Sequence, residues 1–363
     1  MERWQEELRQ TIRTLEELQT HIPDLPIEPL RAVTSTMRLA ITPHSAKLID
    51  FRNPEDPLFK ICVPHTKELL TTPEELEDPI GDEAKSPLPF LTHRYPDRVL
   101  IYPTFFCSLS CRFCFRRFKT GHAMSGPTAS DLDRIIEHLR AHPEVDEVIL
   151  TGGDPLTLVD AQLESLFQRI RSVSSIHRIR IHTRVPVNLP SRITEAFVML
   201  LKRYQDATHP LYIVTHFNHA RELASENVEA ISRLVDAGIV VRNQHVLLRG
   251  VNDTVTDLSA LYKTLTNIRV VPYYLHQLDL ARGTNHFRVP IEEGLELMRG
   301  LQGHLSGICL PKYMLDLPGG KGKIPLQPTY LQQTGERSYT ALSFTGETST
   351  YIEPAIDIAK HED

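Results

Sequence analysis

The chain has 363 residues, of which 41% are hydrophobic and 24% are charged, and its formal net charge is −6. This ordinary composition excludes a collagen-like, disordered or coiled-coil chain. The slightly acidic balance argues against a nucleic-acid partner, because such proteins usually hold phosphates with a basic surface. No apolar stretch approaches the ~20 residues of a membrane span, and the first residues are highly charged, so we expect no membrane association and a cytoplasmic protein.

Residues 1–90 are expected to precede the main domain as a helical and wrapping segment. Apolar residues recur at steps of three and four from Trp4 to Leu18, which predicts one amphipathic helix. Prolines interrupt this pattern, and a second helix is predicted over residues 30–40. Residues 52–89 are rich in Pro, Glu and Asp, which is typical of an extended segment that wraps a domain rather than of a core.

Six runs rich in β-branched residues begin near residue 98, and helical patterns separate most of them. The predicted strands cover residues 98–102, 145–150, 176–182, 211–214, 239–246 and 268–275, with the clearest helices at 131–141, 160–172 and 228–237. Strands and helices that alternate at this spacing predict βαβ units and a parallel sheet.

Polar or ionisable residues lie just past nearly every predicted strand. In α/β barrels the functional residues come from the ends of several strands, whereas an open doubly wound sheet concentrates its site at one point. We therefore predict an α/β fold with a partial (β/α)6 barrel over residues 91–300. Residues 301–363 are predicted to add a β segment, in which a hairpin with its turn at 344–347 closes one end of the barrel. The strand-end residues are Cys107, Asp154, Arg184, His216, Gln244 and Asp279.

Three of the five cysteines lie within eight residues, in the string Cys107-Ser-Leu-Ser-Cys111-Arg-Phe-Cys114 after the first predicted strand. Thiolates so spaced can converge on a soft metal centre, such as zinc, copper(I) or an iron–sulfur cluster. A structural zinc ion normally has four protein ligands, and the sequence offers no second cysteine pair for such a site. We therefore favour an iron–sulfur cluster, and we expect Cys62 and Cys309 to be buried core thiols.

The C-x3-C-x2-C spacing, with Phe113 before the third cysteine, resembles the radical SAM superfamily. The resemblance implies a partial (β/α)6 barrel and a [4Fe–4S] cluster on the three cysteines, with one open iron that binds S-adenosylmethionine (SAM). Further strings are similar to the lysine 2,3-aminomutase family, in which pyridoxal phosphate (PLP) is a second cofactor. These strings are residues 91–98, 150–155, 215–219, 243–253 and 316–325, and the likeness extends over nearly the whole chain.

The resemblance places several residues of the strand ends around SAM. Gly152 and Gly153 would contact its methionyl amino group, with Asp154 directly after them. His216 and Gln244 correspond to positions near SAM in the family. By itself, a Gly-Gly-Asp string is an ordinary strand-to-helix turn and a lone histidine is usually part of a core, so these assignments depend on the resemblance.

The glycine-rich string from Asp316 to Lys323 superficially resembles a phosphate-binding loop. It lacks the Gly-Lys-Ser/Thr ending of a P-loop and the helix that should follow, and a surface turn with two solvated lysines is the simplest alternative. In the aminomutases a similar string carries the lysine that forms a Schiff base with PLP, and Lys323 aligns with it. Lys321 replaces a glycine of that string and stays a competing amine or a phosphate contact.

Other residues are assigned by the same resemblance. Arg94 and Tyr95 match residues around PLP, and an arginine suits a phosphate. Arg116 corresponds to the arginine that binds the substrate α-carboxylate, and Asp279 and Asp316 to two acids that bind the distal ammonium of lysine. Paired carboxylates hold a cation and reject an acidic side chain. Glutamate-specific relatives depart at these two positions, whereas this chain does not.

The implied reaction moves the α-amino group of a basic amino acid, with L-lysine the first candidate, to the β-carbon. Arginine is a second candidate substrate, and a shorter relative that modifies an elongation-factor lysine is a further alternative. Outside the enzymes, a zinc-binding structural protein could use the same cysteines. The expected partners are a small amino acid, a reductant such as flavodoxin or ferredoxin, and other copies of the chain in a homo-oligomer.

The sequence departs from longer family members in two places. Those members bind a structural zinc ion through a cysteine-rich tail and a cysteine that here is Thr254, so we predict no such zinc. The string His276-Gln-Leu before Asp279 replaces a more usual aromatic residue and cysteine, which predicts an altered pocket near the end of the substrate.

Overall fold

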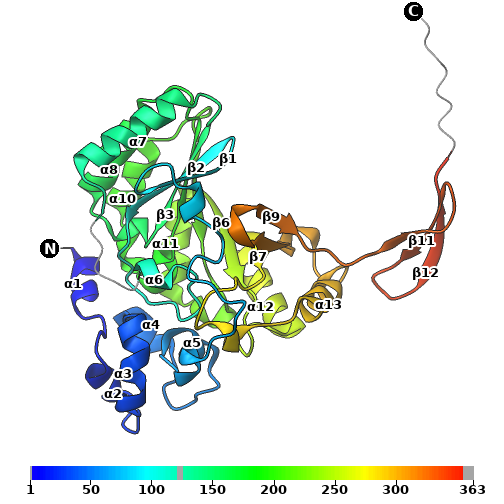
Figure 1. Ribbon diagram of the computed structural model, residues 1–363, viewed down its shortest axis with the longest axis horizontal. Coiled ribbons are helices and arrows are strands. Elements are labelled where there is room, and N and C mark those ends of the chain that lie inside the picture. Colours follow the sequence, from blue (N-terminus) through cyan, green and yellow to red (C-terminus); the bar gives the residue numbers. More distant parts are fainter. Residues whose placement is uncertain (1, 121–125, 355–363) are drawn as a thin grey trace, which may run out of the picture.

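The structure, a computed structural model, describes residues 2–120 and 126–354. An incomplete barrel of strands forms its centre, helices cover the outside of the barrel, and a small separate sheet extends away from it at the C-terminal end (Figure 1). The predicted α/β class and partial barrel are confirmed. Part of the predicted last segment, residues 355–363, lies outside the described residues, and the domain boundaries at 90 and 300 stay predictions.

The main sheet has nine strands, which lie side by side in the order in which they occur in the chain. Seven of them, β2 to β8, are parallel, and β1 and β9 add an antiparallel strand at each edge. All six predicted strands are present, and β8 is a seventh parallel strand that the sequence analysis did not assign. The bounds are β1 (Leu91–Tyr95), β2 (Arg98–Thr104), β3 (Glu147–Gly152), β4 (Arg178–His182), β5 (Leu211–Thr215), β6 (Val240–Val246), β7 (Val271–His276), β8 (Lys312–Leu317) and β9 (Gly322–Pro325).

Helices connect the parallel strands and cover the outer face of the sheet (Figure 1). The three predicted helices correspond to α7, α8 and α11, each within a few residues of its expected ends. The barrel helices are α6 (Arg117–Thr120), α7 (Ala129–Ala141), α8 (Asp160–Arg171), α9 (Val185–Asn188), α10 (Glu195–Arg203), α11 (Ser225–Asp236), α12 (Val255–Asn267) and α13 (Ile291–Leu301), and those of the N-terminal segment are α1 (Arg3–Arg9), α2 (Leu15–Gln19), α3 (Ile27–Thr36), α4 (Pro43–Leu48) and α5 (Pro57–Cys62).

The alternation of side chains along the strands separates an apolar outer face from a polar inner face. Val148, Leu150, Ile179 and Ile181 point outward and share the main core with apolar side chains of α7, α8 and α10. The intervening residues point inward and include arginine, histidine, glutamine and tyrosine. A closed barrel is usually filled by branched aliphatic residues. The interior here is instead a cavity, which apolar side chains such as Ile149 and Val214 line together with the polar ones.

The N-terminal segment packs on the loop that follows β2, through a second hydrophobic cluster that includes Leu109 and Phe113 of that loop. The prediction of one helix over residues 4–18 is wrong. Ile12 pairs with Ile41 through two backbone hydrogen bonds of 2.9 and 3.0 Å, and this extended pairing separates α1 from α2. Residues 52–89 also do more than wrap the domain, because buried Ile61 of α5 belongs to the cluster.

The C-terminal strands β10 (Leu331–Gln333), β11 (Ser338–Leu342) and β12 (Thr348–Ile352) form a sheet of their own. The predicted hairpin exists between β11 and β12, but the prediction that it closes the barrel is wrong. Its sheet stands away from the barrel (Figure 1), and the residues of β10 and β12 are exposed. Contact is made near the hairpin turn, where the Phe344 ring lies 5.6 Å from the His304 ring after α13.

A buried ion cluster attaches the cysteine loop to the N-terminal segment. Glu68 accepts hydrogen bonds from Arg112 at 2.9 and 2.6 Å and from Arg117 at 2.5 Å. All three side chains are at most 1% exposed. Burial by itself would raise the pKa of Glu68, but the two guanidinium groups outweigh burial and lower it. Since Arg112 lies between the second and third cysteines, this cluster fixes the path of the loop.

The variant E68A should be strongly destabilised, because it leaves two guanidinium groups buried without a counter-charge. Removing one partner of a buried ion pair costs about 3–5 kcal/mol, which urea denaturation should show as a lower free energy of unfolding. E74A removes an exposed carboxylate nearby in the sequence and should leave the stability almost unchanged. Equal stability of the two variants would contradict this role of Glu68.

Candidate active site

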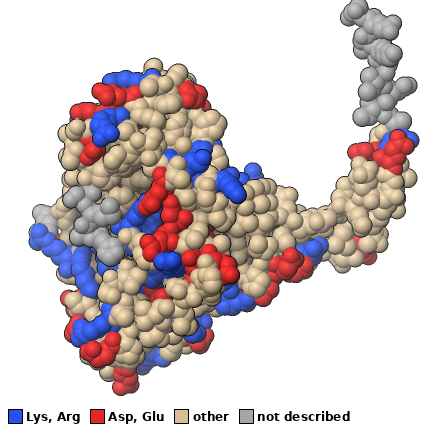
Figure 2. All heavy atoms as spheres, in the orientation of Figure 1, with Lys and Arg blue, Asp and Glu red and all other residues tan. Residues whose placement is uncertain are grey.

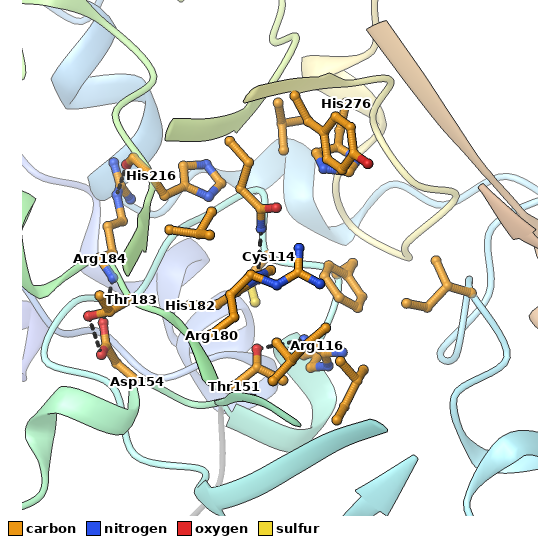
Figure 3. A pocket seen from close by; sticks show the side chains of 18 of the residues that line it. Cys114, Arg116, Thr151, Asp154, Arg180, His182, Thr183, Arg184, His216 and His276 are labelled. Atoms are coloured by element: carbon orange, nitrogen blue, oxygen red, sulfur yellow. Dashed lines mark hydrogen bonds between the residues drawn. The ribbon is translucent and has the colours of Figure 1, made fainter. Parts of the chain in front are cut away.

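The inner face of the barrel surrounds a cavity of about 610 Å³, a size that suits a cofactor together with a small substrate. Figure 3 shows side chains from neighbouring strands around it, among them Thr151, Arg180 and His216. Gly152 does not line the cavity. Every other predicted site residue does: Arg94, Tyr95, Cys107, Cys111, Cys114, Arg116, Gly153, Asp154, His216, Gln244, Asp279, Asp316 and Lys323.

The three clustered cysteines lie on the loop after β2 and are free thiols, and Cys62 and Cys309 are buried as predicted. All three clustered cysteines line the cavity, so a metal centre bound to them would be open to a ligand in the cavity.

The electrostatics of the loop favour a metal centre. Burial raises the pKa of Cys107 and of Cys114, and the neighbouring cysteines raise both further. A positively charged metal centre would offset this repulsion and stabilise the thiolate forms that bind it. Sulfur donors also suit iron–sulfur clusters. Donor type, spacing and charge all fit a [4Fe–4S] cluster with three protein ligands.

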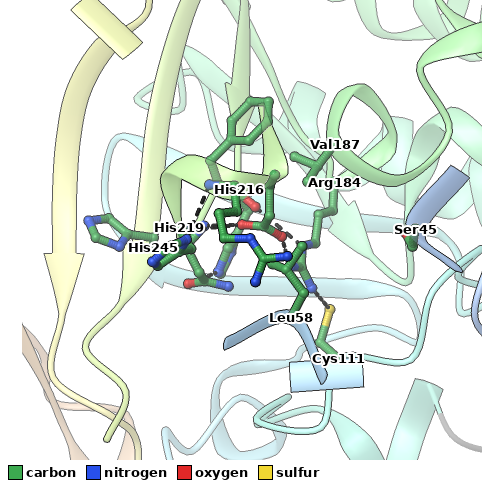
Figure 4. A network of polar contacts seen from close by, with 12 residues as sticks. Ser45, Leu58, Cys111, Arg184, Val187, His216, His219 and His245 are labelled. Carbon is green, nitrogen blue, oxygen red and sulfur yellow. Dashed lines mark hydrogen bonds and ion pairs between the residues drawn. The ribbon is translucent and has the colours of Figure 1, made fainter. Parts of the chain in front are cut away.

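Arg184 connects the cysteine loop to the ends of β4 and β5 (Figure 4). Its guanidinium donates to Cys111 Sγ at 2.8 Å, to Glu222 Oε1 at 2.5 Å and to the His216 backbone oxygen at 3.2 Å. Burial by itself would lower the pKa of Arg184, but Cys111 and Glu222 outweigh burial and raise it. A permanent positive charge therefore lies against one of the cluster cysteines.

The end of β3 approaches the cysteine loop so closely that side chains are excluded. A Cβ at Gly153 would lie 2.4 Å from backbone atoms of Phe105 and Phe106, and Gly152 has a φ of +115°. The carboxylate of Asp154 is used inside the protein: it accepts hydrogen bonds from Thr183 Oγ1 and the Arg184 backbone, both at 2.6 Å. Asp154 thus joins the ends of β3 and β4.

His216 and Gln244 face the cavity from β5 and β6. His216 Nε2 lies 3.1 Å from Asn218 Oδ1, and burial, with the nearby charge of Arg184, holds its pKa well below the usual range, so the ring is neutral. Gln244 Nε2 lies 3.1 Å from His182 Nδ1. The other nitrogen of that ring, His182 Nε2, is buried and has no partner among the described residues. An unpaired buried atom beside a cavity suits a polar ligand.

Two arginines of the cavity share one carboxylate. Arg94 donates to Asp82 Oδ1 at 2.7 Å, and Arg116 donates to Asp82 Oδ2 at 2.8 Å. Asp82 is buried, which would raise its pKa, but the two arginines lower it. Arg94 Nε has no partner within the described chain. Asp82 therefore fixes two cationic groups, and each keeps capacity to bind an anion.

A lysine and two acids lie together on one side of the cavity, beside Tyr95. Lys323 on β9 is the cross-strand partner of Asp316 on β8, and its Nζ donates to Asp316 Oδ2. The backbone N–H of Lys323 donates to Tyr95 Oη at 2.9 Å. Asp316 Oδ1 is buried and finds no partner in residues 2–120 or 126–354. Lys321 is exposed and does not line the cavity, which favours Lys323 as the functional amine.

The two acids of this side have opposite protonation tendencies. Burial and the charge of Asp316 raise the pKa of Asp279 to about 7. For Asp316, burial is outweighed by a hydrogen bond with His276 and by the charge of Lys323, so its pKa is lowered. The charge of each carboxylate therefore affects the pKa of the other. A second cation near them would favour the ionised form of both.

Comparison with known proteins agrees with this geometry. Residues 101–260 match the model of the radical SAM superfamily, and residues 298–363 match a family model described as lysine-2,3-aminomutase. An L-lysine 2,3-aminomutase of Acetoanaerobium sticklandii is 43% identical over 97% of this chain and 84% of its own length. That of Bacillus subtilis is 42% identical over 97% of this chain and 74% of its own.

The chain belongs to the lysine 2,3-aminomutase family. It is therefore an isomerase of the radical SAM superfamily, whose cofactors are a [4Fe–4S] cluster and SAM, and its family relatives depend on PLP. The family also contains a glutamate 2,3-aminomutase of Clostridioides difficile, 38% identical over 92% of this chain and 78% of its own length. Membership alone therefore does not determine the substrate. In the described part of the chain, no helix is long and apolar enough to cross a membrane.

The site of this aminomutase contains residues that sequence reasoning did not assign. Asp82, Glu222 and Glu68 each bind one or two arginines but lie on segments without a motif. Arg180 and His182 face the cavity from β4, and the alternating pattern of that strand was the signal that could have identified them, since its apolar residues point outward.

Removing the positive charge beside Cys111 should lower the reduction potential of the assembled cluster. The reduction potential of such a cluster depends on the net charge around it and on hydrogen bonds to its sulfur ligands. R184Q removes one positive charge and the hydrogen bond to Cys111 Sγ. We expect a decrease of tens of millivolts in an anaerobic redox titration followed by electron paramagnetic resonance. R184K keeps the charge and should show a smaller decrease, and equal potentials in R184Q and the wild type would contradict this role of Arg184.

Proposed function

We propose that this enzyme moves the α-amino group of L-lysine to the β-carbon, and the observation that carries this proposal is the pair of acids in the cavity. Both acids line the same cavity. Asp279 follows β7, and Asp316 belongs to β8. Two carboxylates at one end of a binding cavity suit a substrate with a distal cation and repel a distal carboxylate. The glutamate-specific relative is therefore a less suitable guide to the substrate than the lysine-specific relatives.

The other end of the substrate is assigned to Arg116. Its guanidinium is held by Asp82 and lies over the Phe115 ring, with 4.4 Å from its carbon to the ring centroid. The planar donor groups of arginine match a carboxylate well. A basic amino acid bound between Arg116 and the two acids would have both of its ends neutralised.

Lys323, Arg94 and Tyr95 are the residues that we assign to PLP. Lys323 provides an amine inside the cavity, and Arg94 provides a guanidinium with an unpaired Nε for the phosphate. The backbone N–H of Lys323 donates a hydrogen bond to Tyr95 Oη, and Tyr95 thereby orients the lysine. Lys323 would hold PLP through its amine, and Asp316, which accepts a hydrogen bond from that amine, would then be free to bind the substrate ammonium.

We assign Cys107, Cys111 and Cys114 to the cluster. We assign Gly153, His216 and Gln244 to SAM, with Gly152 and Asp154 in a supporting role. When bound, these two cofactors supply a 5′-deoxyadenosyl radical that removes a hydrogen atom from the substrate, while PLP carries the migrating amino group. The surrounding residues hold the reacting groups and exclude water. A covered cavity suits radical chemistry, because it prevents side reactions.

The remaining partners are part of the same proposal. We expect a flavodoxin or ferredoxin as reductant, a cytoplasmic location, and a homo-oligomer in which the exposed sheet β10–β12 contributes contacts. That sheet carries exposed Leu331, Tyr351 and Ile352, which suit a protein contact better than water. On the face seen in Figure 2, acidic and basic side chains are interspersed, which gives no support to a nucleic-acid partner.

The proposal is tested by incubating the reconstituted, reduced enzyme with SAM, PLP and L-lysine, and separating the products by chromatography with mass detection. We expect β-lysine, with parallel incubations showing no isomer from L-glutamate. A further incubation contains L-arginine, and formation of β-arginine there without formation of β-lysine from L-lysine would overturn the assigned substrate.

Cysteine variants test the assigned cluster ligands. C111A should bind much less iron and sulfide on anaerobic reconstitution, because one of three ligands is lost, whereas C309A removes a thiol far from the loop and should retain the wild-type content. Iron content should be measured together with circular dichroism, which monitors folding. An unchanged cluster in C111A would contradict the assignment.

The pH dependence of the reaction tests Asp279. Its pKa of about 7 means that the carboxylate becomes charged as the pH rises through neutrality, whereas the distal ammonium of lysine, with a pKa of about 10.4, stays charged. We expect kcat/KM for lysine to rise by up to about tenfold per pH unit below pH 7 and then to level off. D279N should be less active and lose this step, and a wild-type profile in D279N would contradict the role of Asp279.

A further inference from the structure

Outside the cavity, three histidines converge at the edge of the barrel where β1 meets α7. His93 belongs to β1, His138 to the last turn of α7, and His142 is the C-cap of that helix. One nitrogen of each ring lies within 4.8 Å of the others, and all three residues are partly buried. The His138 and His142 rings have centroids 4.3 Å apart.

The local structure explains why these side chains meet. Residues four positions apart lie on one face of a helix, so His138 and His142 project together from the end of α7. His93 does not line the cavity, although its neighbours Thr92 and Arg94 do, and the pairing of β1 with β2 is irregular between Thr92 and Tyr95. The histidines therefore form a cluster separate from the active site.

The distances suit a divalent transition metal. His93 Nδ1 and His138 Nε2 are 3.1 Å apart. Two nitrogens bound to one tetrahedral zinc ion, each at about 2.0–2.1 Å, are about 3.3 Å from each other. The two rings are therefore already near the spacing that a zinc ion requires. Imidazole suits zinc, copper and nickel, whereas magnesium and calcium prefer oxygen ligands.

A carboxylate lies beside one of the three rings. His142 Nδ1 lies 2.9 Å from Glu144 Oε1. A carboxylate that accepts the second N–H of a metal-binding histidine orients the ring, and Glu144 is placed to do this or to bind the metal itself.

We propose that His93, His138 and His142 form a binding site for one divalent transition-metal ion, with Zn²⁺ preferred and with a water molecule or Glu144 as the fourth ligand. The ion attaches the edge strand β1 to α7. Because β1 also carries Arg94 and Tyr95 on its cavity side, the ion stabilises the strand that positions these two residues. The site does not depend on the proposed substrate.

Zinc titration of the holoenzyme tests this proposal. The cluster is assembled first, so that Cys107, Cys111 and Cys114 do not compete for zinc. Isothermal titration calorimetry should show one Zn²⁺ site per chain. H138Q and, separately, H142Q should each lower the zinc affinity of this site. The decrease should exceed the roughly 10–100-fold that follows the loss of a residue that only hydrogen-bonds to a metal ligand. Zinc should also raise the melting temperature of the wild type but not of these variants.

The matched control is H177Q, which removes one histidine from another close pair, His177 and His209, whose rings lie 5.5 Å apart. It should bind zinc as the wild type does. X-ray absorption of the zinc-loaded holoenzyme should show imidazole nitrogens at about 2.0–2.1 Å. The proposal is overturned if the wild type binds no zinc, in which case the 3.1 Å contact is only a hydrogen bond between rings, or if H138Q and H142Q bind as tightly as the wild type.

Discussion

The organisation of the active site depends on buried carboxylates that each hold arginines in place. Glu68 binds Arg112 and Arg117, Asp82 binds Arg94 and Arg116, and Glu222 binds Arg184. Long cationic side chains at the edge of a cavity would otherwise turn toward water, at little cost. A buried counter-charge prevents this, because separating the pair would leave both charges desolvated. The cysteine loop and the anion-binding groups therefore have defined positions before any cofactor or substrate binds.

Much of the fold could be predicted from the sequence because the strands alternate with helices and their outward residues are apolar. The cysteine spacing and the strand-end motifs indicated residues that, apart from Gly152, line one cavity, and their roles stay predictions. Other features depend on contacts between distant segments. Glu68 and Arg112 are 44 residues apart, and Arg116 and Asp82 are 34 apart, so no local pattern connects them. Lys321 and Lys323 carry the same side chain, and their places in the structure distinguish them: Lys321 is exposed in the turn before β9, whereas Lys323 lies in β9 and lines the cavity.

The two errors in the predicted fold have a common physical reason. A local sequence pattern does not show which distant segments contact one another. An apolar repeat continues through residues 4–18, yet the backbone pairing of Ile12 with Ile41 interrupts the helix. The hairpin of β11 and β12 has the expected turn, yet its strands are exposed or only partly buried and stand away from the barrel (Figure 1). In both cases the pattern indicated the element type, and the long-range contacts determined its extent and position.

The antiparallel pairing of β8 with β9 places Asp316 directly opposite Lys323. With the proposed roles, one tight hairpin carries both the amine that anchors a cofactor and the acid that receives the far end of the substrate. The register of the hairpin fixes the separation of the two backbones, so the amine and the acid are positioned as one unit.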